Sequence, residues 1–250
     1  MTIHFHRSGH GAPLLMLHGL GLDRRAWNGL SALSDSFELM SCDLPGHGET
    51  LSPPVPYGIG ELSELIAAAL RQAGLSKTHV IGHDLGGVVA QHLAANEPGL
   101  VGRLVLCATT PTFNDNDQTL WRQHAAMARE AGAGAIAHSL EPDWFTPEFL
   151  ALNPPALHLM RDSFAACSAE GMALNCEALA TADLIDLAGE IYARTLVLVG
   201  DSDTLAYREA ADWLAQSIAG AKLAIVPHAA HVPMLEQPGW MTDVLRTFLG

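Results

Sequence analysis

The sequence predicts an α/β fold in which helices cover a mostly parallel sheet and a helical segment is inserted between two strands. Two observations carry this prediction. Short apolar runs that end in turn residues alternate with amphipathic segments along most of the chain, a pattern typical of βαβ units with buried parallel strands. The alternation stops between about Pro111 and Leu187, where no strand-like run occurs and Ala, Leu, Met and Glu are common.

The expected elements follow in chain order. Residues 2–7, TIHFHR, alternate in polarity and predict a half-buried edge strand. Continuous apolar runs predict further strands near residues 13–19, 37–42, 78–84, 101–110, 194–203 and 222–231. Helical spacing of apolar residues and a Pro-Gly stop predict helices over residues 60–73, 86–99 and 240–249.

These elements divide the chain into a core, residues 1–110 and 187–250, and a helical lid, residues 111–186. The length of 250 residues suits one such domain, and the hydrophobic share of 49% excludes a disordered chain. The net charge of −14 argues against nucleic-acid and anionic membrane partners, because both require clustered Lys and Arg. No signal peptide or transmembrane segment is recognised, so a cytoplasmic protein is expected.

The segment Gly82-His83-Asp84-Leu85-Gly86 lies between a predicted strand and a predicted helix. Small residues two positions on either side of Asp84 allow a very sharp turn, and the helix that follows directs its first N–H groups at the apex. This arrangement is typical of a nucleophile elbow, with Asp84 as the nucleophile. The alternative is a plain strand–helix turn with an exposed aspartate.

Three other segments complete a candidate site. The loop after His18-Gly19 places the backbone N–H of Leu20 where it can join that of Leu85 in an oxyanion hole. Acidic residues, among them Asp203, follow the strand near residues 194–200. His231 follows the next strand, so the order is nucleophile, acid, histidine, as in a catalytic triad of this type.

Over almost its full length the chain resembles the α/β-hydrolase superfamily, and within it the 3-oxoadipate enol-lactonases and related esterases. The resemblance implies that Asp203 is the triad acid, His231 the triad base, and Leu20 and Leu85 the oxyanion-hole residues. Asp84 is the departure, because those lactonases have serine there, whereas haloalkane and haloacetate dehalogenases and epoxide hydrolases have aspartate. The segments that carry the resemblance are LHGLGLDRRAW, DLPGHGET, AREAGAGAIAHSLEPDWFTPEF, TLVLVGDSDT and HAAHVPMLEQP.

The aspartate favours displacement at a saturated carbon. A carboxylate is ionised at neutral pH and needs no base to act as a nucleophile. Attack by Asp84 on an epoxide or an alkyl halide would give an ordinary ester, which water activated by His231 and Asp203 could then cleave. The main prediction is therefore a cofactor-free hydrolase of a small, largely apolar substrate, with a covalent ester on Asp84.

Other residues favour different interpretations. None of the three tyrosines, Tyr57, Tyr192 and Tyr207, falls in the predicted lid, and Leu85 stands where haloalkane dehalogenases usually place tryptophan. One alternative is an ester or lactone hydrolase in which Asp84 acts as a base or replaces a serine nucleophile. The second is a non-catalytic member of the fold that binds small molecules. The sequence leaves open whether Asp84 is native or an engineered replacement of serine.

The remaining expectations concern the pocket and the partners. Substrate contacts are predicted from His18, Trp27, His83, Trp121 and Trp144. No cofactor and no metal are expected, since the histidines do not group with carboxylates at ligand spacing. The expected partner is a small-molecule substrate, and the protein is expected to be a monomer or a homodimer.

Overall fold

A seven-stranded sheet forms the centre of the computed structural model, which describes residues 3–53 and 55–250. The strand order is β1-β3-β2-β4-β5-β6-β7; β1 runs antiparallel to β3, and all other neighbours are parallel. The predicted fold class is thereby confirmed. The strands are β1 His6–Gly9, β2 Ala12–Leu17, β3 Phe37–Cys42, β4 Thr78–His83, β5 Val101–Cys107, β6 Arg194–Gly200 and β7 Lys222–Val226.

Helices pack against this sheet in two groups, one in which α10 and α9 contact η1, and one that joins α1, α2, η2 and α8. Strand β4 is almost completely buried and β2 is buried from Leu14 to Leu17, as continuous apolar runs between helical layers should be. The helices of the two groups are η1 Arg24–Asp35, α1 Ile59–Gln72, α2 Leu85–Asn96, η2 Ile185–Glu190, α8 Leu205–Ser217, α9 Pro233–Glu236 and α10 Pro238–Leu249.

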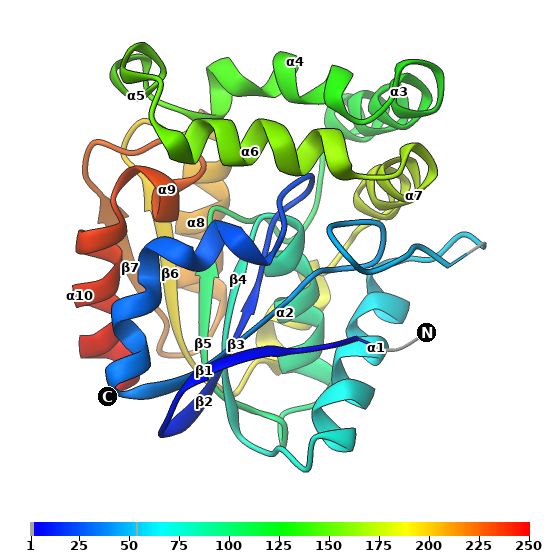
Figure 1. The fold of residues 1–250 in the computed structure, drawn as a ribbon. Helices are drawn as coiled ribbons and strands as arrows, with labels where there is room; N and C mark the ends of the chain where they lie inside the picture. Colours follow the sequence, from blue (N-terminus) through cyan, green and yellow to red (C-terminus); the bar gives the residue numbers. More distant parts are fainter. Residues whose placement is uncertain (1–2, 54) are drawn as a thin grey trace.

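Five further helices follow β5 and precede β6 in the chain, and they lie together at one end of the sheet (Figure 1). An isolated antiparallel bridge between Thr112 and Asp183 joins the two chain segments that enter and leave this helical insertion. Within it, α3 packs extensively along α7. Its helices are α3 Asp115–Ala131, α4 Gly134–Trp144, α5 Pro147–Leu152, α6 Pro155–Ala166 and α7 Ala169–Ala180.

The structure differs from the sequence-based expectation at the first strand and at three helices outside the insertion, η1, α8 and α9, that were not predicted. The first strand begins at His6 and is exposed throughout, not half-buried; Thr2, where it was expected to begin, lies outside the described residues. Helix α8 was not anticipated. Only Ala211 and Leu214 are fully buried on it, so its apolar face is too narrow to stand out from the sequence.

None of the helices that the structure describes is long and apolar enough to span a membrane. All four cysteines, Cys42, Cys107, Cys167 and Cys176, are buried free thiols.

Candidate active site

Asp84 occupies the sharp turn between β4 and α2. Its backbone has φ 47° and ψ −115°, a conformation that costs a non-glycine residue about 1–3 kcal/mol. Four hydrogen bonds hold it: Asp84 N–H donates to Cys107 O, Gly86 N–H donates to His18 O, and Asp84 O accepts from Thr109 Oγ1 and from Val88 N–H. The neighbouring strands therefore impose the strained turn.

The two glycines of the segment are required by close contact between backbones. A Cβ atom on Gly82 would lie 2.3 Å from Gly86 O, and one on Gly86 would lie 2.3 Å from Leu17 O and 2.5 Å from His18 O. Real Cβ atoms do not approach so closely, and backbone carbonyls cannot swing aside as a side chain can. The geometry is that of the strand–turn–helix that the sequence predicts.

One carboxylate oxygen of Asp84 is held by a predicted oxyanion-hole donor. Leu20 N–H donates to Asp84 Oδ2 at 2.9 Å, and both residues are buried. Leu85 is the first residue of α2, so its N–H has no acceptor within the helix. Leu20 and the start of α2 thus converge on Asp84 from two loops that are far apart in the sequence.

The other oxygen, Oδ1, faces His231. The distance from His231 Nε2 to Asp84 Oδ1 is 3.9 Å, too long for a direct hydrogen bond, and Nε2 has no hydrogen-bond partner among the described residues. On the far side of the ring, His231 Nδ1 lies 3.2 Å from Asp203 Oδ2. Asp84, His231 and Asp203 therefore stand in the order that the sequence predicts, with a gap between the first two.

The charge state of His231 is set by its carboxylates. Burial by itself lowers the pKa of His231, but the negative charges of Asp203 and Asp84 and the hydrogen bond to Asp203 outweigh it. The net pKa of His231 therefore lies above the ordinary value of 6.5. An imidazole whose pKa is raised in this way accepts a proton more readily than a free imidazole does.

The structure also separates the two acids that follow β6. Asp201 accepts the backbone N–H groups of His228 and Ala229, so it braces the loop and does not reach the imidazole. Asp203 Oδ1 accepts Thr204 N–H at 2.7 Å, which leaves Oδ2 for His231. Asp203 is thus the acid in contact with the histidine.

Tyr207, on α8, reaches the site although sequence reasoning set it aside. Its hydroxyl lies 3.4 Å from Asp84 Oδ1, and its ring centroid is 4.2 Å from that of His231. Burial and the nearby Asp84 carboxylate raise the pKa of Tyr207 well above its ordinary value, so the hydroxyl keeps its proton. Its position four residues after Asp203 is visible in the sequence, but neither α8 nor the direction of the Tyr207 side chain is.

Two histidines predicted to contact substrate serve the backbone instead. His18 is fully buried; its Nδ1 is 2.8 Å from Gly19 O, and its Nε2 accepts Leu44 N–H at 2.9 Å. His83 is also fully buried and lies with Nε2 2.8 Å from His231 O. Burial lowers the pKa of His83 to about 3, so it is neutral. Both predictions of pocket contacts are corrected accordingly, since neither ring lines the cavity.

The helical insertion is tied to the histidine loop. Trp144 O accepts the N–H groups of His231 and Val232, and the two rings of Trp144 and His231 lie 5.3 Å apart. Glu236 accepts Thr146 N–H with one oxygen and Ala230 N–H at 2.7 Å with the other. These contacts fix the position of His231 relative to α4.

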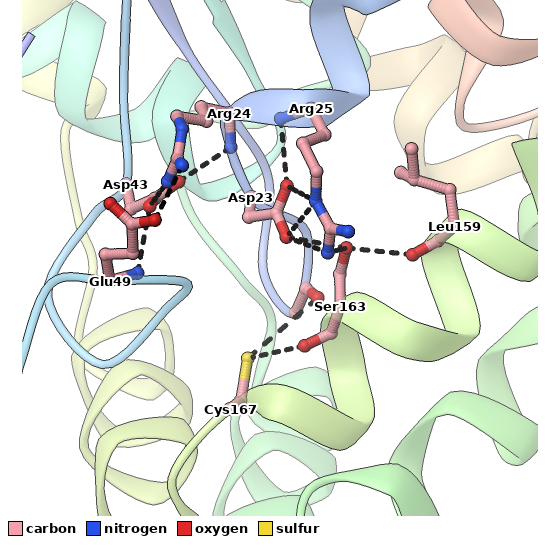
Figure 2. A network of polar contacts seen from close by, with 9 residues as sticks. Asp23, Arg24, Arg25, Asp43, Glu49, Leu159, Ser163 and Cys167 are labelled. Carbon is pink, nitrogen blue, oxygen red and sulfur yellow. Dashed lines mark hydrogen bonds and ion pairs between the residues drawn. The ribbon is translucent and has the colours of Figure 1, made fainter. Parts of the chain in front are cut away.

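A second set of contacts ties the insertion to the loop that carries Leu20 (Figure 2). Ser163, on α6, donates to Asp23 Oδ2 at 2.9 Å, and Arg25 Nη2 lies 2.6 Å from the same oxygen. A Cβ atom on Gly21, where φ is 70°, would lie 2.1 Å from the Phe164 ring. Helix α6 therefore rests directly on this loop, with no space between them.

A cavity of about 350 Å³ opens above His231. Trp121 and Trp144, from which substrate contacts are expected, line it together with Tyr207 and Asp203. Trp27 does not: it is buried on η1 and borders a separate surface depression. The structure does not bring Trp27 to this cavity, because Trp27 lies with residues of β1, β2 and β3 around the separate depression. Among the described residues, no three His, Cys, Asp or Glu side chains are placed to hold a metal ion.

Comparison with known proteins defines the class. A model of the alpha/beta hydrolase family matches residues 14–244. The chain therefore belongs to the alpha/beta hydrolase family, and it is a hydrolase.

Its relatives include esterases and lactonases. It is 28% identical over 226 residues to 3-oxoadipate enol-lactonase 2 of Acinetobacter baylyi, covering 90% of this chain and 84% of that protein. It is 32% identical over 249 residues to the pimeloyl-[acyl-carrier protein] methyl ester esterase of Chromobacterium violaceum, covering 94% and 93%. The enol-lactonase from Burkholderia xenovorans superimposes with a TM-score of 0.93 at 30% identity, covering 99% of this chain and 96% of that chain.

Proposed function

We propose that the protein hydrolyses a small ester or lactone in the cavity above His231. The relatives support this substrate class, because they include an enol-lactonase and methyl ester esterases aligned over most of both chains. The observation that carries the proposal is the buried His231, whose Nδ1 is held by Asp203 and whose Nε2 is unpartnered beside the cavity. Ester hydrolysis needs such a base near the substrate.

In this proposal the gap between His231 and Asp84 holds the attacking water. His231 Nε2 and Asp84 Oδ1 are 3.9 Å apart. A water oxygen about 2.8 Å from each of them would form an Nε2–O–Oδ1 angle of roughly 90°, so it could donate one hydrogen bond to each atom. His231 takes one proton of that water, Asp84 Oδ1 orients the other, and the water oxygen bonds to the acyl carbon. When the tetrahedral intermediate collapses, protonated His231 returns its proton to the departing alcohol oxygen, so that an acid and an alcohol leave and His231 is neutral again.

Asp84 limits this route. Its Oδ2 already accepts the N–H of Leu20, so a substrate oxyanion would have to share or displace that contact. A serine at position 84 is shorter and would leave the Leu20 N–H free. We therefore expect Asp84→Ser to retain or raise activity on esters and lactones.

The contact between Leu20 and Asp84 favours a second candidate function, the displacement reaction at a carbon electrophile. One oxygen, Oδ1, would attack the carbon of an epoxide or an alkyl halide and expel oxygen or halide. The resulting Asp84 ester would keep Oδ2 as its carbonyl oxygen, already against Leu20 N–H, which would stabilise the oxyanion when water attacks. Tyr207 would lie beside the departing group as a hydroxyl donor.

Two experiments separate the candidates. The first compares wild type, Asp84→Ser and Asp84→Asn on short-chain p-nitrophenyl esters, γ- and δ-lactones, styrene oxide and 1-bromobutane. Ester or lactone turnover that persists in Asp84→Ser supports the first function. If both wild type and Asp84→Ser are inactive on every ester and lactone, that function is wrong.

The second experiment is a single turnover in heavy-oxygen water followed by mass spectrometry of the peptide that contains Asp84. Covalent attack by Asp84 places the heavy oxygen in its carboxylate, because water cleaves the ester at the Asp84 carbonyl. Attack by water places it only in the acid product. Label in the Asp84 carboxylate after ester turnover would refute the role of Asp84 as an orienting group.

The helical insertion serves as a lid in this proposal, because α4 and α6 contact the histidine loop and the Leu20 loop. The partner is a small molecule. The monomeric or homodimeric state expected from the sequence remains part of the proposal, and sedimentation of the purified protein would decide it.

A further inference from the structure

The wall of the cavity above His231 is aromatic and acidic. Phe113, Trp121, Trp144 and Tyr207 supply aromatic faces. Asp117, Asp143 and Glu209 supply carboxyl groups, and no Lys or Arg is among the described residues that line the cavity. Asp203 adds a further carboxyl group at its floor.

These wall carboxyl groups are not neutralised by basic side chains. Asp117, Asp143 and Glu209 take part in none of the ion pairs formed by the described residues. Elsewhere on the insertion two arginines have carboxylate partners: Arg129 pairs with Glu170 and Glu177, and Arg161 pairs with Glu141. The third, Arg122 on α3, donates to Gln118 and does not line the cavity. Two of the three arginine charges of the insertion are therefore compensated away from the cavity, whereas the wall carboxyl groups have no basic partner among the described residues.

Buried groups without protein partners indicate that the same cavity receives a ligand. His231 Nε2 and His124 Nδ1 both lack hydrogen-bond partners among the described residues, and both side chains line the cavity. Each residue is at least nine-tenths buried, so bulk water does not readily satisfy it. The acidic wall is thus part of a ligand site and not a solvated surface alone.

We propose that this hydrolase selects esters or lactones whose distal group is an ammonium cation, and that it disfavours substrates with a free carboxylate or phosphate. Aromatic faces attract cations through their quadrupole, and uncompensated carboxylates add a longer-range attraction. A dicarboxylate such as malate, which is bound in the related esterase from Thermogutta terrifontis, would meet like charges here. The inference deepens the proposed ester hydrolysis and rests on it.

The test uses three acetate esters of similar size. Their alcohols are choline, which is cationic, 3,3-dimethylbutanol, its neutral isostere, and 4-hydroxybutanoate, which is anionic. We expect kcat/KM to be about tenfold higher for the choline ester than for the neutral ester at low salt, and lower still for the anionic ester. The preference should shrink as salt is raised, because the Debye length falls from about 30 Å at 0.01 M to about 3 Å at 1 M.

The variant pair Glu209→Gln and Asp212→Asn assigns the effect to the cavity. Both residues are exposed on α8, but only Glu209 lines the cavity. We expect Glu209→Gln to reduce the choline-to-neutral ratio two- to threefold, as an order of magnitude for one partly screened charge. Asp212→Asn should leave the ratio unchanged. An equal loss in both variants would assign the effect to net charge and overturn the proposal.

A binding measurement keeps this proposal separate from the proposed function. Phenyltrimethylammonium, benzyl alcohol and benzoate are titrated against the fluorescence of Trp121 and Trp144, with Trp121→Phe as the variant that identifies the cavity signal. Hydrolysis of the neutral ester without preference for choline overturns the charge selectivity and leaves ester hydrolysis standing. If no ester is hydrolysed, tighter binding of the ammonium probe than of benzoate still supports the selectivity, and equal or weaker binding overturns it.

Discussion

The floor and the wall of the cavity are built in different ways. The floor, His231 and Asp203 with Asp84 beneath them, is almost fully buried. It is held by hydrogen bonds with the end of β5, with the loops that follow the strands and, for His231, with Trp144 on α4. The wall comes from α3, α4 and α8, and its charged residues Asp143 and Glu209 are exposed. In the proposed function, the ends of the strands and their loops position the reacting groups, whereas the exposed charges on the surrounding helices would set the choice of substrate.

The largest loss of activity is expected when the base in the floor, His231, is removed. His231→Gln removes the group that accepts the proton, and we expect kcat to fall by about a thousandfold or more with the fold intact. The exposed His158→Gln, on α6, is the matched control and should retain full activity. Initial rates and circular dichroism of both variants test this. Activity within tenfold of wild type in His231→Gln would remove this residue from the mechanism.

The close contact between backbones beneath Asp84 predicts the next largest effect. Gly86→Ala introduces a Cβ 2.3 Å from Leu17 O, and we expect a loss of about 3 kcal/mol in the free energy of unfolding. For a chain of this size that corresponds to a Tm lower by about 6–12 °C. Gly99→Ala, where no heavy atom lies within 4 Å, is the control. Equal thermal unfolding curves for the two variants would contradict the argument.

Tyr207 links the floor to the wall. Tyr207→Phe removes one hydroxyl that faces Asp84 Oδ1, and we expect kcat to fall about tenfold with little change in KM. Tyr192→Phe, whose hydroxyl contacts only the exposed Glu190, is the control. A change confined to KM would instead place Tyr207 among the residues that merely bind substrate.

The smallest effect is expected from the charge of Asp143, in the wall, on the pKa of His231, in the floor. His231 must be neutral to act as a base, so activity is lost as the pH falls through its pKa, which lies above 6.5. Asp143 contributes to raising the pKa of His231, so Asp143→Asn should move the acidic limb of the pH–rate profile to lower pH. The exposed Asp212→Asn should not move it. A shift to higher pH in Asp143→Asn would contradict the assigned sign.

The fold class was predictable because its evidence is local. Buried parallel strands, the glycines around Asp84 and the turn residues after each strand leave marks within a few positions of one another. The first strand, η1 and α8 were not predicted correctly. An exposed edge strand and a helix with a narrow apolar face, such as α8, leave weak patterns. The order of Asp84, Asp203 and His231 along the chain likewise needed no structure.

The sequence alone therefore determined the class of fold, the sharp turn at Asp84 and the acid and base that stand beside it. Only the tertiary structure decided what surrounds them. It brought Tyr207 to the carboxylate, set Leu20 N–H on Asp84 Oδ2, and removed Trp27 from the cavity. The physical reason is that turns depend on neighbours in sequence, whereas the direction of a side chain on a helix depends on how that helix packs against elements a hundred or more residues away.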